Sequence, residues 1–209
     1  MTISDDVLTH MPPEPFKTIG PKVRSGDLLL CAAHDPFSRL IGWATHSPWS
    51  HVAIAYRWPA LSRIMAFEAV QQIGVRAVPL QTFIRQSSTG EKPYPGKIIL
   101  ARHEDFARAH GRPSSDKARR FADFAVDRIG DPFAPAEIAK IGARVMLGRL
   151  ARAMPRSLGP KDEFICSEYV AKCFERIGLK IPWDGQGFIA PADFAADPKI
   201  KAIARFRTR

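Results

Sequence analysis

Two kinds of hydrophobic pattern divide the chain, and their order limits the folds open to it. Apolar runs of strand length come first, and they cover Leu28–Leu30, His51–Tyr56, Ile64–Val70, Gly74–Val78 and Lys97–Ala101. Helical spacing follows and predicts helices at about residues 116–129, 135–153 and 166–177. A chain with its strands first and its helices afterwards is typical of an α+β fold.

The first third of the chain carries helix and turn signals as well. Asp35-Pro36 is a helix start, and the helix is expected to end near Thr45. Its expected buried residues are Leu40, Ile41 and Trp43. Residues 1–22 contain Pro12, Pro13, Pro15 and Pro21, which we expect to prevent regular structure. The predicted organisation is a proline-rich leader over residues 1–22 and one domain over residues 23–209.

The chain is strongly basic. Its 209 residues include 31 Lys and Arg against 21 Asp and Glu, which gives a net charge of +10. This balance favours an anionic partner such as nucleic acid, a lipid surface or an acidic polymer. Nucleic acid is the weakest of these, because the sequence has no zinc finger, no RNA-binding motif and no aromatic residues within its basic run.

Much of the positive charge lies between Glu137 and Asp162, a stretch that contains no Asp or Glu. The basic residues of this stretch are Lys140, Arg144, Arg149, Arg152, Arg156 and Lys161. Apolar residues alternate with them at helical spacing, as in helices that lie on an anionic membrane surface. An ordinary solvated basic helix face fits the same pattern.

Three cysteines, Cys31, Cys166 and Cys173, are too few for a disulfide framework. None has CxxC spacing, so neither a zinc site nor another cofactor is expected. The N-terminus lacks a secretory signal pattern, and the longest apolar run, Leu28–Ala33, is too short to span a bilayer. We therefore expect a cytoplasmic protein, with peripheral attachment to a membrane as an alternative.

Cys166 stands at the expected start of a helix, after Phe164 and Ile165. A thiol there is close to unpaired backbone N–H groups and to the positive end of the helix dipole, and both favour the thiolate. The same N–H groups can stabilise the oxyanion of an acyl-transfer intermediate. The alternative is a buried structural cysteine, which is common in protein cores.

His51 begins one apolar strand, and Glu68 is the only acid in the next. A loop with Pro59 and Ser62 joins the two strands, which predicts an antiparallel hairpin with Glu68 opposite or diagonal to residues 51–53. A carboxylate in that place can orient an imidazole that acts as a general base. An edge histidine beside a solvated glutamate is the alternative. His10, His103 and His110 have polar neighbours in sequence and are expected at the surface, and His46 is expected in a loop.

Four sequence fragments follow one another along the chain: Arg24–Leu30, Ala44–Ile54, Ala66–Ala69 and Phe164–Val170. Together they resemble the circularly permuted papain-like cysteine hydrolases, the YiiX-like branch of the NlpC-type peptidase superfamily, to which lecithin–retinol acyltransferase is related. In the permuted order the histidine strand precedes the cysteine helix. The resemblance implies a barrel-like antiparallel sheet packed against helices, with the nucleophile at a helix N-terminus.

The resemblance also implies residue roles. Cys166 would be the nucleophile, with its backbone N–H in the oxyanion hole, His51 the general base, and Glu68 the residue that orients the imidazole. The candidate substrate contacts are Trp49, Ser50 and Tyr169. Relatives often have tyrosine at the position of Phe133, so a phenol from that position is absent here.

Three functions follow as hypotheses. The first is a cysteine hydrolase that cleaves an amide or ester bond through an acyl-thioester, with a peptide or cell-wall peptide as substrate. The second uses the same residues to transfer or hydrolyse a lipid acyl group at a membrane surface. The third is a binding module that keeps the fold without catalysis.

Overall fold

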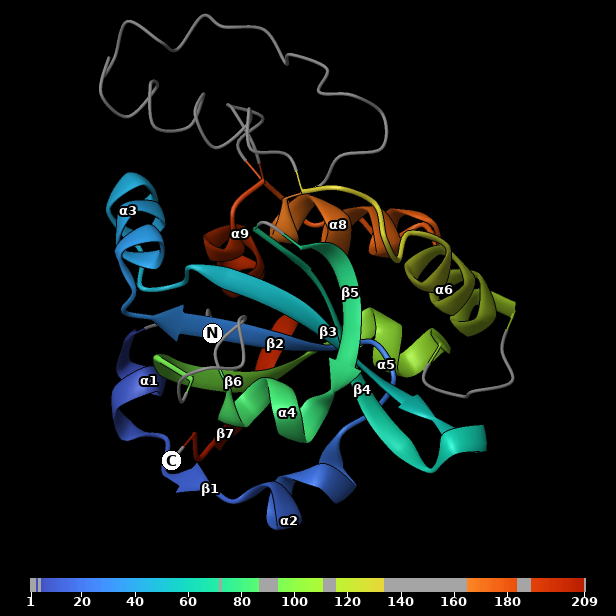
Figure 1. Ribbon diagram of the computed structural model, residues 1–209, viewed down its shortest axis with the longest axis horizontal. Coiled ribbons are helices and arrows are strands. Elements are labelled where there is room, and N and C mark those ends of the chain that lie inside the picture. The colour runs from blue at the N-terminus through green and yellow to red at the C-terminus, as the bar shows by residue number, and fades with distance from the viewer. Residues whose placement is uncertain are drawn as a thin grey trace, which may run out of the picture.

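One seven-stranded sheet organises the described part of the chain in the computed structural model (Figure 1). The structure describes residues 3, 5–71, 73–86, 94–110, 116–133, 165–183 and 189–208. The strand order is β1-β7-β6-β2-β3-β4-β5, and every neighbouring pair is antiparallel except β1 and β7. The strands are β1 Pro13–Glu14, β2 Asp27–Ala33, β3 His51–Trp58, β4 Arg63–Val70, β5 Gly74–Pro79, β6 Gly96–His103 and β7 Ile200–Phe206.

The expected α+β class is confirmed, but the expectation of a barrel-like sheet was wrong. β1 and β5 are the two ends of the strand order, and the described strands do not pair these ends with each other. The sheet is therefore open. The predicted hairpin of β3 and β4 is confirmed, with Ile54 opposite Phe67.

Alternating side chains of β2 contribute to two hydrophobic cores, one on each face of the sheet. Leu28 and Leu30 belong to the larger core, which includes residues of α5, α6, α8 and α9. Leu29 and Cys31 belong to the smaller core, which includes residues of α2 and α4. Figure 1 shows α6, α8 and α9 on one side of the sheet and α2 and α4 on the other.

The helices are α1 Asp5–His10, α2 Phe16–Ile19, α3 Pro36–Thr45, α4 Leu80–Arg85, α5 Glu104–His110, α6 Asp116–Asp127, α8 Cys166–Glu175 and α9 Pro191–Ala196, with short 3₁₀ turns at Gly20–Lys22 and Pro59–Leu61.

The N-terminal segment corrects the expectation of an irregular leader. It contains α1, β1 and α2, and the prolines lie between or at the ends of these elements, where a missing N–H costs little. Ile3, Leu8 and Ile19 are buried. Pro13 and Glu14 pair with Arg205 and Phe206 of β7. This segment therefore packs against the sheet.

The predicted helix after Asp35 is confirmed as α3, and Asp35 caps it by accepting a hydrogen bond from the Ser38 N–H at 3.0 Å. The expected burial of Trp43 was wrong, because its side chain is 60% exposed.

Two elements at the C-terminal end, α9 and β7, were not predicted. β7 carries Lys201 and Arg205 among apolar residues, and this positive charge concealed a strand that pairs with β6. The helix expected at residues 135–153 and the basic residues Lys140 to Lys161 lie outside the described residues.

Candidate active site

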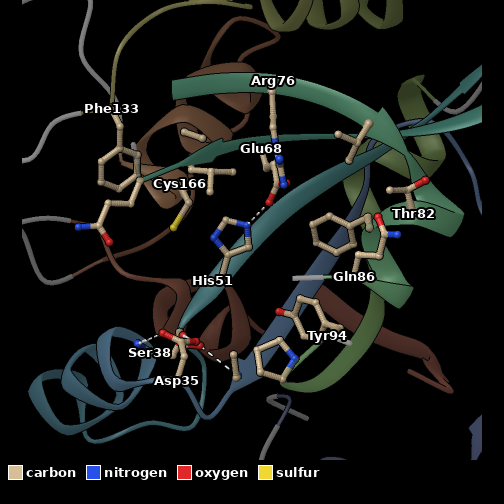
Figure 2. Close-up of a pocket in the computed structure, with 18 residues that line it drawn as sticks. Asp35, Ser38, His51, Glu68, Arg76, Thr82, Gln86, Tyr94, Phe133 and Cys166 are labelled. Carbon is tan, nitrogen blue, oxygen red and sulfur yellow. Dashed lines mark hydrogen bonds and ion pairs between the residues drawn. The ribbon is translucent and has the colours of Figure 1, made fainter. Parts of the chain in front are cut away.

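Cys166 is the first residue of α8, after Ile165 in extended conformation. The helix is held in place by its buried side chains Tyr169, Val170, Cys173 and Phe174, which belong to the larger core. The Ser167 hydroxyl also donates to the Ile189 carbonyl at 2.7 Å. This packing directs the first turn of α8, and with it the Cys166 thiol, toward the start of β3 (Figure 2).

His51 and Glu68 meet across the β3–β4 hairpin. The register of Ile54 opposite Phe67 places Glu68 diagonal to His51 on one face of the sheet. The His51 Nε2 lies 2.8 Å from the Glu68 Oε2. The ring therefore has one nitrogen beside a carboxylate, while its other edge faces the Cys166 sulfur (Figure 2). The structure brings Cys166, His51 and Glu68 together.

Arg76 is a member of this cluster that sequence reasoning missed. β5 pairs with β4 so that Arg76 lies directly opposite Glu68. Its Nε and Nη2 donate to the Glu68 Oε1 at 2.9 and 2.7 Å, while Oε2 contacts His51. The signal that could have found it is a single cation in the otherwise apolar run Gly74–Pro79, next in the sheet to a strand with a single acid.

The charges in the cluster support one another. Burial alone raises the pKa of the Cys166 thiol, but the His51 charge and hydrogen bonds from the backbone of Val52 and Ser167 lower it below the usual 9.0. Burial alone lowers the pKa of His51, but Cys166 and Glu68 raise it to about 10. Burial raises the pKa of Glu68, but His51 and Arg76 lower it below its usual value. These directions favour a thiolate beside an imidazolium.

A cavity of about 320 Å³ opens beside the thiol (Figure 2). Cys166, His51, Glu68 and Arg76 line it. Its other walls include the acidic Asp35 and several neutral polar and aromatic side chains, namely Ser50, Thr82, Gln86, Phe83, Tyr94 and Phe133. The cavity therefore gives a small molecule or a chain segment access to the thiol.

Phe133 reaches the cavity because the turn that follows α6 is hydrogen-bonded to β5. The Gly130 N–H donates to the Val75 carbonyl, and the Val75 N–H donates to the Asp131 carbonyl, both at 2.9 Å. Gly74 allows this close approach, since its φ is +90° and a side chain there would collide with the Asp131 carbonyl. Phe133 thus lines the cavity with a phenyl ring.

Of the three candidate substrate contacts, only Ser50 lines the cavity. Trp49 is 2% exposed and its indole N–H donates to the Ile3 carbonyl at 3.2 Å. Tyr169 is fully buried and its hydroxyl donates to the Ala125 carbonyl at 2.9 Å. Neither Trp49 nor Tyr169 therefore lines the cavity, because both side chains pack in the larger core.

The other cysteines and His103 lie in the cores. Cys31 and Cys173 are fully buried, as expected, and burial raises the pKa of both thiols. The expectation of a surface His103 was wrong: it is 2% exposed and its ring lies 5.8 Å from that of Phe174. Of the three thiols, that of Cys166 is therefore the one whose pKa is lowered.

Neither a known protein family nor a curated protein matches this sequence. Among solved structures, the fold is similar to that of the metalloprotein YiiX from Escherichia coli O157:H7, a DUF1105 protein. The TM-score is 0.58 at 22% sequence identity, and the match covers 87% of this chain and 96% of YiiX. The chain thus shares the fold of YiiX over nearly all of its length.

Proposed function

We propose that this protein is a cysteine hydrolase that cleaves an amide or ester bond through an acyl-thioester intermediate. The observation that carries the proposal is the His51 imidazole between the Cys166 thiol and the Glu68 carboxylate, with 2.8 Å from Nε2 to Oε2. A nucleophile, a base and a group that orients the base are the parts that acyl transfer requires.

In acylation, the Cys166 thiolate attacks the carbonyl carbon and a C–S bond forms. The backbone N–H of Cys166 at the start of α8 stabilises the oxyanion. The intermediate collapses, the carbon–nitrogen or carbon–oxygen bond breaks, and the His51 imidazolium donates its proton to the leaving amine or alcohol. Glu68 holds the ring while its charge changes, and Arg76 holds Glu68.

In deacylation, neutral His51 accepts a proton from a water molecule as the water attacks the thioester. The C–S bond then breaks, and a carboxylic acid and the Cys166 thiolate result. Transfer to an alcohol or amine in place of water uses the same residues, so hydrolysis and transfer differ in what enters the cavity.

YiiX is a metalloprotein, but the site described here does not fit a metal centre. Both oxygens of Glu68 are in use, one by His51 and one by Arg76. Within the described ranges, no three His, Cys, Asp or Glu side chains are grouped to hold an ion. We therefore derive no step through a metal.

The proposal is tested by labelling with a thiol-directed electrophile at neutral pH and by locating the modified residue by mass spectrometry. Cys166 is expected to react, and the rate is expected to fall in His51→Ala. Cys31 and Cys173 are internal controls, because both are 0% exposed, whereas Cys166 is 7% exposed and lines the cavity. Equal labelling of all three cysteines in native protein would refute the proposal, and an unshifted Cys166 titration near pH 8.5 would favour a binding module instead.

A lipid acyl substrate is a second candidate, and its support is the acid-free basic stretch from Lys140 to Lys161 in the sequence. None of the described helices has the length and apolar character needed to cross a bilayer. Flotation with anionic and neutral liposomes at low salt tests surface attachment. Attachment to anionic vesicles alone would support this candidate, and absence of attachment would contradict it.

A further inference from the structure

A second cavity, also of about 320 Å³, is lined by residues of a different region from the thiol cavity. It is found where β1, β6 and β7 meet, and Pro13, Lys97 and Arg205 line it. Tyr94 and Pro95 line both cavities. The two cavities are therefore neighbours.

The second cavity is lined by three cations: Lys97, Arg205 and Arg207. Its described walls include no Asp or Glu. Three like charges that share a concave surface repel one another, and low-dielectric walls strengthen the field that they produce. The cavity therefore has a strong positive potential.

The polar contacts of these cations within the described residues are to main-chain carbonyls. The Lys97 Nζ donates to the Leu8 carbonyl at 3.4 Å, and the Arg205 Nη1 to the Leu8 and Met11 carbonyls at 3.0 and 3.2 Å. The Arg207 Nη2 donates to the Pro13 carbonyl at 3.5 Å. A carbonyl satisfies a hydrogen bond but carries no net charge, so the positive charge stays uncompensated there.

Arg205 gives the most direct sign of a missing ligand. Its Nε is buried, and no acceptor among the described residues contacts it. A buried N–H without an acceptor costs about 1–3 kcal/mol in proteins, more where the donor is charged. An oxyanion in the cavity would supply both an acceptor and the opposite charge, since guanidinium groups bind carboxylate and phosphate in a fork geometry.

We propose that this second cavity is an anion-binding site for a carboxylate or phosphate group, held by Lys97, Arg205 and Arg207. The wall shared with the thiol cavity places the anion beside the proposed reaction site. The anion belongs either to a small molecule or to the headgroup of a lipid, and the experiment separates these sources.

The test is a calorimetric titration of the full chain with inorganic phosphate at low salt, with acetate as the carboxylate probe. Saturable one-site binding is expected. The double variant Lys97→Met/Arg207→Gln is expected to weaken it at least about tenfold. The matched control Lys17→Met/Arg63→Gln removes the same charge outside the cavity, where Arg63 is also held by a main-chain carbonyl, and is expected to change affinity less than about twofold.

Absence of saturable binding in the native protein would overturn the proposal, as would equal weakening in the control. Thermal unfolding checks that the variants fold, and the exposed Arg207→Gln alone replaces the double variant if that variant does not. Titration of Cys166→Ala separates the anion site from hydrolysis, because binding is expected to persist without the thiol.

Vesicles of phosphatidic acid distinguish the two sources. Vesicle binding that the double variant loses, with weak binding of free phosphate, assigns a lipid headgroup. If the native protein binds free phosphate or acetate tightly and the double variant leaves vesicle binding unchanged, the anion belongs to a small molecule. If the double variant keeps both free-anion binding and vesicle binding, the proposed site is contradicted.

Discussion

Two histidines, the partly buried His51 and the fully buried His103, each lie beside a carboxylate, yet their surroundings shift their pKa values in opposite directions. His51 is 2.8 Å from Glu68 and also faces Cys166, and its pKa is raised to about 10. His103 is 3.7 Å from Asp197 and lies against the Phe174 ring. Burial lowers its pKa below 6.5, although Asp197 offsets part of the effect.

The difference shows that one nearby carboxylate does not define a catalytic histidine. At 3.7 Å a carboxylate contributes attraction without a hydrogen bond, and the desolvation of a buried imidazolium outweighs it. At the candidate active site a short hydrogen bond acts together with a second anion, the Cys166 thiolate. At neutral pH these shifts favour the charged form of the His51 imidazole and the neutral form of the His103 imidazole.

The largest expected effect separates the two histidines by reactivity. His51→Ala is expected to lower the alkylation rate of Cys166 at pH 7 by roughly 100-fold, because the thiolate loses its counter-charge. His103→Gln is the control and is expected to change the rate less than about twofold. Stopped-flow alkylation measures both rates, and equal losses in the two variants would contradict the comparison.

Replacement of the carboxylate gives a smaller effect. Glu68→Gln keeps a hydrogen-bond acceptor for His51 but removes the charge, so the His51 pKa is expected to fall from about 10 and the alkylation rate to drop roughly tenfold. The matched change at the other histidine, Asp197→Asn, is expected to leave the rate unchanged. NMR titration of the imidazole protons follows both histidines, and a His51 pKa that is unchanged in Glu68→Gln would count against its role.

Arg76 acts through Glu68, so its effect is expected to be smaller at neutral pH and larger in acid. Arg76→Gln removes a cation that lowers the Glu68 pKa, so Glu68 is expected to protonate at a higher pH. The acid limb of the alkylation rate then moves to higher pH, while the rate near pH 8 falls only about threefold. Arg76→Lys is expected to restore the profile in part. A uniform loss at every pH would indicate a structural role alone.

The smallest effects concern stability, and the two histidines are expected to act at opposite ends of the pH scale. The raised pKa of His51 stabilises the fold fully below pH 6.5, and this contribution is lost as pH rises through about 10. The lowered pKa of His103 makes the fold lose stability as pH falls below 6.5, by about 1.4 kcal/mol for each unit of lowering.

Urea unfolding from pH 4.5 to 10.5 measures the stability of the native protein, His51→Ala and His103→Gln. The His103 variant is expected to lose less stability in acid than the native protein. Asp105, Glu104 and Lys199 also act on His103 and are unchanged in this variant. Parallel curves for the native protein and the His103 variant below pH 6.5 would show that His103 has no share in the acid response.

Sequence reasoning could place Cys166, His51 and Glu68 because each signal is local. Cys166 begins a helix that its neighbours specify, and a hairpin with a short loop fixes which residues of two adjacent strands meet. Arg76 could not be placed in the same way, because its contact depends on the register of a third strand. The residues around the thiol could thus be predicted from the sequence, and the contact of Arg76 with Glu68 could not.

The wrong predictions concern burial more than secondary structure. His103 has Arg102 and Glu104 beside it in sequence, but β6 turns its ring toward Phe174 from a distant helix. Trp49 and Tyr169 flank the reactive residues, yet their side chains point into the core. Proline in the N-terminal segment predicted irregular chain, whereas tertiary contacts with β7 stabilise short elements there.

The pairing of β1 with β7 sets an order of events during synthesis. The Pro13 carbonyl accepts a hydrogen bond from Arg207, which the ribosome adds 194 residues later. β1 must therefore wait until β7 has been synthesised, and until then β6 has an unpaired edge that another nascent chain could occupy. Emergence of β7, more than emergence of the cysteine helix, is then the step that completes the sheet.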